Sequence, residues 1–207
     1  MKAPDGWEQC KAAWIEVPKM RVTIYQAAKA GNTALYRALC NHHGVKLRED
    51  EQRGTRRIKG REVHVRYPWQ VREDWPRIAV VREPLARFES LWKNKARDHG
   101  TGCRQIHGLT PDELADFIEA HPRSNSHWQS QAAGMGGLDA TLYPLERWAD
   151  DGWPTLSDTP YPSKPFQINA TGGEIPPYDR ERVLELYSDD VELYNRAQEL
   201  FHGKAEN

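Results

Sequence analysis

Residues 77–85 are Arg77-Ile78-Ala79-Val80-Val81-Arg82-Glu83-Pro84-Leu85, an unbroken apolar run followed by two charged residues and a proline. Such a run is typical of a strand buried on both faces of a parallel sheet. Proline suits the first turn of a helix, and apolar residues then recur at the spacing of one buried stripe: Leu85, Phe88, Leu91 and Trp92. The stretch therefore predicts a strand over 77–81 and a helix that begins at Pro84.

A second unit of the same kind lies earlier in the chain. The segment 21–25 is rich in β-forming residues, residues 27–31 form a turn of small residues around one lysine, and 33–39 has helical propensity and period. Parallel strands need crossover connections, so helices cover both faces of their sheet. We therefore expect an α/β fold: a three-layer α/β/α domain with a central, mainly parallel sheet.

The remaining elements fit a single domain over 1–207. We expect a short strand over 62–67, a helix that begins at a capping box of Thr110 and Glu113, a flexible turn at 134–137, and strands at 141–145 and 165–169. A helix or helix pair over 179–201 closes the chain. Residues 1–20 are expected to form an N-terminal extension, and the Pro-rich stretch 153–165 a surface loop or lid.

Composition excludes several classes of function. The 29 Lys and Arg residues nearly cancel the 30 Asp and Glu, giving a net charge of −1, so the whole molecule does not attract nucleic acid. A local basic stretch over 53–66 either faces a polyanionic substrate or is a solvated loop and strand edge. Cys10, Cys40 and Cys103 match neither a disulfide framework nor a zinc site. With no apolar signal core or bilayer-length segment, we expect a cytoplasmic protein without membrane contact.

The turn Lys29-Ala30-Gly31-Asn32-Thr33 connects a buried strand to a helix. Small residues let backbone N–H groups approach an anion, and a helix N-terminus adds favourable partial charge. It is not a Walker A loop, because it lacks the glycine spacing and the hydroxyl after the lysine. An ordinary strand-to-helix turn with one exposed lysine is the alternative.

A second anion site is suggested at the end of the strand 77–81. Arg82 ends that strand and Ser90 lies two helical turns further, with Arg87 between them. A guanidinium and a hydroxyl are suited to phosphate oxygens, so these residues are candidates for holding a second phosphate. In the alternative interpretation Arg82 pairs with Glu83 or Glu89, and Ser90 is only a small helix residue.

Together these two segments resemble the two motifs that bind 3′-phosphoadenosine 5′-phosphosulfate (PAPS) in sulfotransferases. The branch they resemble most contains the Golgi carbohydrate sulfotransferases, including heparan sulfate 2-O-sulfotransferase. Three further segments are similar to that branch and follow in its order: His127-Trp128-Gln129-Ser130-Gln131, Leu145-Glu146-Arg147-Trp148 with Asp150 and Asp151, and 186–194. The resemblance covers nearly the whole domain and implies a P-loop-like sulfotransferase fold in a soluble bacterial or viral form.

The resemblance also implies roles for individual residues. The backbone from Ala30 to Ala34, through Gly31, and the side chains of Asn32 and Thr33 would hold the 5′-phosphosulfate, while Arg82 and Ser90 would hold the 3′-phosphate. Lys29 would contact the oxygen that bridges phosphate and sulfate, where charge builds as the S–O bond breaks. No metal is required, because positioning and charge stabilisation supply most of the catalysis.

The acceptor hydroxyl must lose a proton, and His64 is our candidate for the base. The segment 63–67 resembles the catalytic-histidine strand of the 2-O-sulfotransferase, which has a second histidine where this chain has Glu62. Residues 62 and 64 share one face of a strand, so Glu62 either orients His64 or is itself the base. A structural role for His64 is the alternative. His127 and Trp128 either shape the acceptor pocket or pack in the core.

The chain departs from the family pattern at two places. Ala28 stands where a proline usually precedes the lysine, and Gly172-Gly173-Glu174 stands where relatives offer basic residues to the nucleotide, a role for which Lys164 is a substitute. We expect an O-sulfotransferase that acts on a saccharide or glycan hydroxyl. The alternatives are a small alcohol or phenol as acceptor, a nucleotide-binding scaffold without turnover, and a nucleotide-dependent kinase, which would require Mg²⁺.

Overall fold

The computed structural model describes residues 14–18, 21–31, 64–100, 102–147 and 172–202. Within these residues the chain forms one five-stranded sheet in the order β3-β1-β2-β4-β5. The strands are β1 (Trp14–Val17), β2 (Val22–Gln26), β3 (His64–Arg66), β4 (Arg77–Val81) and β5 (Thr141–Pro144). β2, β4 and β5 are parallel neighbours, and β1 is antiparallel to both β2 and β3. The α/β class is compatible with this arrangement, but the sheet is mixed and not mainly parallel as expected, with a parallel half at β2, β4 and β5.

The central strands are those expected from their apolar runs. In β4, Ile78 to Val81 are all buried, and in β2 the residues from Val22 to Tyr25 are buried as well. The predicted strands at 21–25, 77–81 and 141–145 are confirmed to within a residue at each end, and the one at 62–67 is seen over 64–66. The strand predicted at 165–169 lies outside the described residues.

Strand β1 differs from the N-terminal extension expected over 1–20. Its four residues are buried and pair with β2 on one side and β3 on the other, so this segment is an interior strand. Glu16 is only 3% exposed, and its Oε2 accepts a hydrogen bond of 2.8 Å from Arg66 Nε on β3. A strand that contains a carboxylate is tolerated here because this arginine lies beside it.

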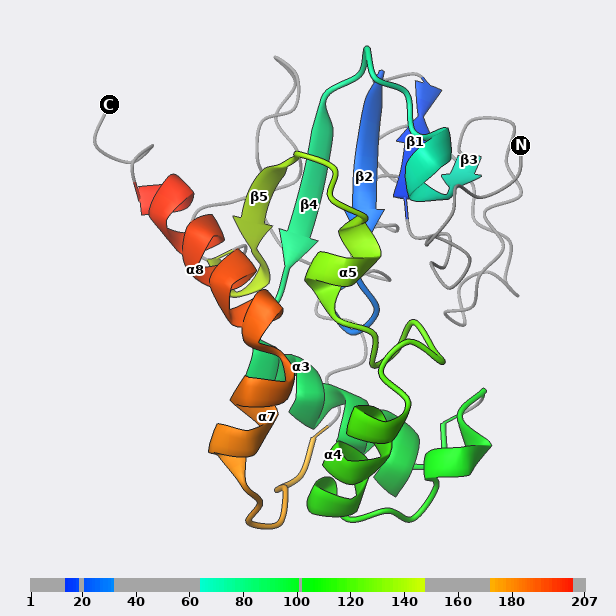
Figure 1. The fold of residues 1–207 in the computed structure, drawn as a ribbon, viewed down its shortest axis with the longest axis vertical. Coiled ribbons are helices and arrows are strands. Elements are labelled where there is room, and N and C mark those ends of the chain that lie inside the picture. Colours follow the sequence, from blue (N-terminus) through cyan, green and yellow to red (C-terminus); the bar gives the residue numbers. More distant parts are fainter. Residues whose placement is uncertain (1–13, 19–20, 32–63, 101, 148–171, 203–207) are drawn as a thin grey trace.

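Helices lie in front of the sheet and beyond the C-terminal ends of its parallel strands (Figure 1). In front are α5 (Gln131–Met135) and α8 (Ser188–His202); beyond the strand ends are α3 (Pro84–Leu91), α4 (Pro111–Ala120) and α7 (Arg180–Leu186). α3 continues as the π-helical segment η3 (Trp92–Arg97), and β5 as the 3₁₀ turn η5 (Leu145–Arg147). The helix expected over 33–39 lies outside the described residues, so the third layer stays a prediction.

Helix starts follow the local signals in the sequence. The capping box at α4 is confirmed, with Glu113 N donating to Thr110 Oγ1 and Thr110 N donating to the Glu113 carboxylate. Pro84 opens α3, and the preceding Glu83 accepts from the backbone N–H groups of Leu85 and Ala86. The predicted closing helices are α7 and α8. The flexible turn expected at 134–137 is partly wrong: Gly134 and Met135 belong to α5, and the chain turns only at Gly136, whose left-handed backbone ends that helix.

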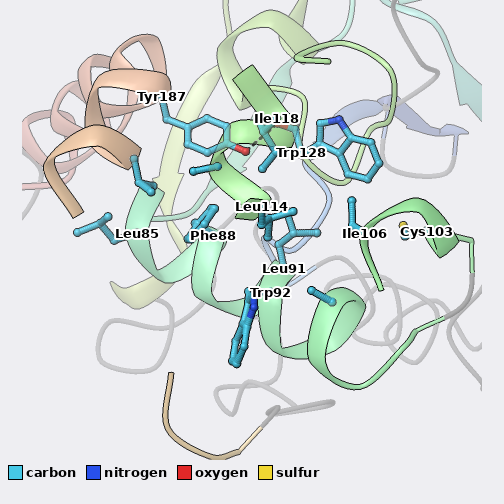
Figure 2. Packing of buried hydrophobic residues seen from close by; sticks show 13 residues of the cluster. Leu85, Phe88, Leu91, Trp92, Cys103, Ile106, Leu114, Ile118, Trp128 and Tyr187 are labelled. Carbon is cyan, nitrogen blue, oxygen red and sulfur yellow. Dashed lines mark hydrogen bonds between the residues drawn. The ribbon is translucent and has the colours of Figure 1, made fainter. Parts of the chain in front are cut away.

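The main hydrophobic core joins α3 to α4, to the segment before α5, and to α7 (Figure 2). Phe88 and Leu91 of α3 face Leu114 and Ile118 of α4, as the predicted stripe requires. Trp128 is fully buried in this core, where its Nε1 donates to His121 O and its ring meets Phe117 edge-on. Of the two roles considered for Trp128, the structure shows packing. No helix in the described part of the chain is long and apolar enough to cross a membrane.

Candidate anion-binding site

The loop Ala27–Gly31 and Arg82 meet at one edge of the sheet. The loop follows β2, Arg82 follows β4, and the two strands are parallel neighbours, with Gln26 paired to Val80. The carboxyl ends of parallel strands are where ligands bind in open α/β sheets. In Figure 1 the arrowheads of the neighbouring strands β2 and β4 point in the same direction, toward the side of the sheet where α3 lies. The structure thus places Lys29 and Arg82 side by side, as the sequence predicts.

Two arginines fix the direction of successive peptide groups in this loop. Arg87 Nε donates to Ala28 O at 3.0 Å, and Arg82 Nη1 donates to Lys29 O at 2.9 Å. Lys29 has a φ of 67° and Gly31 a φ of 74°. A left-handed backbone is uncommon for a lysine, and these two bonds, with Ala30 N donating to Ala27 O at 3.2 Å, account for it. Side-chain hydrogen bonds therefore fix the conformation of this loop, which distinguishes it from an ordinary exposed turn.

The electrostatic environment of Lys29 is cationic. Burial, together with the nearby charges of Lys95, Arg82 and Arg87, lowers the pKa of Lys29 from 10.5 to about 8, while Cys103 acts in the opposite direction. A cation held beside other cations is stabilised by an added anion, because the anion removes both the repulsion and part of the desolvation cost. The loop is thus suited to bind a phosphate or a sulfate.

The guanidinium of Arg82 uses only part of its hydrogen-bonding capacity within the described residues. Its guanidinium lies 3.7 Å from Glu146 Oε1, with no ion pair to Glu83 or Glu89 found among the described residues. Its buried Nε lacks a hydrogen-bond partner within the described part of the chain, although the side chain is 25% exposed. Burial raises the pKa of the Glu146 carboxyl, which the charge of Arg82 opposes. An anion could therefore reach only the exposed part of the Arg82 side chain, beside Glu146, a carboxylate that the sequence did not single out.

Arg87 is a supporting residue and lies too deep to reach a ligand. It is 3% exposed, pairs with Asp190 at 3.5 Å, and donates to Gln129 O at 2.7 Å. The placement of Arg87 between Arg82 and Ser90 in the sequence did not reveal this role. Ser90 is half-buried, one turn beyond Arg87 on α3.

Four of the predicted site residues fall outside the described part of the chain. These are Asn32, Thr33, Ala34 and Glu62, so the helix side of the phosphosulfate loop and one of the two candidate bases are predictions that the structure does not address. Ala30 and Gly31 are described, and both belong to the loop beside Arg82. Lys164 is likewise outside the described residues. Among the residues that the structure describes, no group of three or more His, Cys, Asp or Glu is placed to hold a metal ion.

The backbone of His64 does not lie beside Lys29. His64 pairs with Glu16, Glu16 with Thr23, and Thr23 with Arg77, so this row crosses the sheet at the N-terminal ends of β2 and β4. The loop begins after Gln26, three residues further along β2. With a rise of ~3.3 Å per residue and ~4.8 Å between strands, the Cα atoms of His64 and Gln26 are roughly 14 Å apart. The structure thus brings Lys29 and Arg82 together and leaves the His64 backbone at the opposite end.

The pKa of Lys29 predicts how anion binding depends on pH. Lys29 is charged below pH 8 and neutral above it, and a bound anion raises its pKa. We therefore expect the affinity for adenosine 3′,5′-bisphosphate, the product that a PAPS donor would leave, to fall as the pH rises from 7 through 8 to 9. The phosphates, whose second pKa is about 6, keep their charge over this range. Calorimetry at pH 7, 8 and 9 checks this; an affinity unchanged to pH 9 contradicts it.

No protein-family model, no curated protein and no solved structure matches the chain.

Proposed function

We propose that the protein is a PAPS-dependent O-sulfotransferase. The observation that carries the proposal is the loop Ala27–Gly31, whose carbonyls are held by Arg82 and Arg87 while Lys29 stands in a cationic environment. A donor with two separate phosphate groups needs two adjacent anion sites, and the proposal assigns them to the neighbouring ends of β2 and β4, where Lys29 and Arg82 lie. The resemblance of both segments to PAPS-binding motifs gives the proposal its substrate.

In the proposed reaction the sulfuryl group passes from the donor to an acceptor hydroxyl. The bond between sulfur and the bridging oxygen breaks, a bond between sulfur and the acceptor oxygen forms, and adenosine 3′,5′-bisphosphate leaves. Lys29 stabilises the negative charge that builds on the bridging oxygen. Arg82, together with Ser90, binds the 3′-phosphate and sets the donor in line with the acceptor. The proton of the acceptor goes to a base.

For the base, the prediction from the sequence is His64, with Glu62 as its partner or substitute. If His64 is the base, His64→Ala lowers the turnover number by about 10²–10⁴-fold. The affinity for adenosine 3′,5′-bisphosphate stays unchanged, because a base does not contact the donor phosphates. Turnover assays with His64→Ala and Glu62→Gln, beside the wild type, measure both roles. Because β3 places the His64 backbone away from the loop, this role needs a direct test. Unchanged turnover in His64→Ala would remove His64 from the mechanism.

The acceptor in this proposal is a saccharide or glycan hydroxyl, as in the carbohydrate branch that the segments resemble. The direct test is transfer of labelled sulfate from PAPS to a panel of glycans, small alcohols and phenols, in the presence of a metal chelator. Transfer to any hydroxyl with the chelator present supports the proposal. ATP-dependent, Mg²⁺-requiring phosphorylation would instead identify a kinase, and binding of the donor product without any transfer would identify a nucleotide-binding scaffold.

A further inference from the structure

A network of buried polar side chains lies directly behind the anion loop. Gln131, from α5, is fully buried and pairs with both backbone groups of Arg82: Arg82 N donates to Gln131 Oε1 at 2.9 Å, and Gln131 Nε2 donates to Arg82 O at 2.8 Å. The side-chain amide thus takes the place of a neighbouring strand at the point where β4 ends. It fixes the backbone from which the Arg82 side chain reaches the loop.

The position of Gln131 depends on a close approach of α5 to the sheet. Tyr25 OH on β2 donates to Gln131 O at 3.0 Å. Gly134, one turn further along α5, lies against the same tyrosine, and a Cβ there would overlap the Tyr25 hydroxyl. The glycine therefore allows the contact that places Gln131 beside Arg82.

Asp190 is the centre of the network. It is fully buried in the first turn of α8, where a carboxylate is favoured by the helix dipole. Its Oδ1 accepts from Ala132 N at 2.9 Å, and its Oδ2 lies 3.5 Å from both Arg87 Nη1 and Gln131 Nε2. Asp190 thereby contacts two residues that hold the loop and its neighbour. Arg87 donates to Ala28 O, and Gln131 pairs with the Arg82 backbone.

A buried ion pair of this kind is weak evidence for stability alone, because the desolvation of both charges offsets their attraction. The pair of Arg87 and Asp190 differs in that Arg87 also donates hydrogen bonds to backbone carbonyls outside the pair. Arg87 donates to Ala28 O in the loop as well as to Gln129 O, so the charge of Asp190 holds a guanidinium whose Nε determines the loop's direction. The network joins a helix near the C-terminal end of the chain to the first strand–loop unit.

We infer that Asp190 and Gln131 are positioning residues for the anion loop: through Arg87 and the Arg82 backbone they hold Ala28 and Lys29 in the conformation that binds the anion. The inference rests on the proposed function for the identity of the ligand. The geometry of the loop itself does not depend on that identity. Removing the charge of Asp190, with its shape kept, should therefore loosen residues 27–31 before it unfolds the sheet.

The test compares Asp190→Asn and Gln131→Met with a matched control, Glu16→Gln. The control makes the same change of carboxylate to amide on a buried side chain that pairs with an arginine, but on β1, in the row of Thr23 at the other end of the sheet. Amide hydrogen exchange is followed by NMR for residues 27–31 and for the β4 amides, and the binding of adenosine 3′,5′-bisphosphate is measured by calorimetry.

We expect protection of the Ala30 amide, which donates to Ala27 O within the loop, to fall by about tenfold or more in Asp190→Asn and Gln131→Met, while β4 stays protected, and affinity to fall by a similar factor. In Glu16→Gln the loop and the affinity stay as in the wild type. Equal loop protection in Asp190→Asn and the wild type would overturn the inference. If Asp190→Asn does not fold, the neutral Gln131→Met variant decides by the same exchange criterion. A wild type that binds no donor product contradicts the proposed function, and loop exchange still tests the network.

Discussion

Replacing Lys29 with methionine is expected to slow sulfuryl transfer by about 10²–10³-fold with the donor saturating, the cost of removing one preorganised group that stabilises transition-state charge. Methionine keeps an unbranched apolar stem where Lys29 is half-buried, but it offers no charge to the bridging oxygen as the S–O bond breaks. The loop conformation is retained, because the bonds from Arg82 and Arg87 end on backbone carbonyls that the substitution leaves in place.

The measurement for Lys29→Met is a single-turnover assay with labelled PAPS, which reports the transfer step apart from product release. Lys29→Arg is the matched control, since it keeps a positive charge and should lose less activity than Lys29→Met. The variant also lacks the group whose pKa is about 8, so its affinity for the donor product should no longer fall between pH 7 and 9. Transfer by Lys29→Met at the wild-type rate would remove Lys29 from the catalytic step.

Replacing Trp128 with alanine is expected to lower the free energy of unfolding by about 3–5 kcal/mol. The side chain is fully buried among α3, α4 and the segment before α5 (Figure 2), and its Nε1 donates to His121 O at 2.9 Å. The backbone oxygen of Trp128 accepts from Tyr187 OH at 2.9 Å, so a collapse at this point also disturbs the approach to α8.

Urea unfolding measures the Trp128→Ala effect, with Leu200→Ala as the control. Leu200 is 47% exposed, and its truncation should change stability by no more than about 0.5 kcal/mol. Trp128→Phe should lie between alanine and the wild type, because it restores part of the packing but removes the indole N–H that donates to His121 O. A loss below about 1 kcal/mol for Trp128→Ala would show that this tryptophan does not hold the core together.

The parallel half of the sheet and the first turns of the helices were predictable from the sequence, because their signals are local. Four successive apolar residues specify β4 wherever it lies, and the Thr110–Glu113 capping box specifies the start of α4. Strand β1 has no such signal: it is four residues long and contains the buried Glu16, whose partner Arg66 lies fifty positions away. Its place between β2 and β3 depends on contacts between residues that are far apart in the sequence.

The same distinction applies to the candidate site. Lys29 and Arg82 were predictable, since each follows a recognisable strand and parallel neighbours end at one edge. The buried partnership of Arg87 with Asp190 was not, because the two residues are 103 positions apart and look like ordinary surface charges in the sequence. Gln131, Glu146 and Asp190 do stand within the three segments that resemble carbohydrate sulfotransferases. That resemblance was the one signal that pointed to them.

The position of His64 shows how one missed strand affects a site. Period-2 alternation identified the strand that contains His64, but its register depends on β1, which aligns His64 with Glu16 and so with the start of β2. The proximity of Lys29 and Arg82 is therefore an observation, whereas their role in donor binding is a proposal, and the acceptor half depends on the His64 and Glu62 variants.

Calorimetric titration of the wild type and Arg82→Met with adenosine 3′,5′-bisphosphate and with adenosine 5′-phosphate tests the central claim most directly. Because Arg82 also bonds to Lys29 O, the ratio of the two affinities isolates its contact with the 3′-phosphate. We predict that the wild type binds the bisphosphate about 100-fold more tightly than the monophosphate, and that Arg82→Met loses most of this preference. Absence of binding to the wild type, or a preference that Arg82→Met retains in full, would contradict the two-phosphate site.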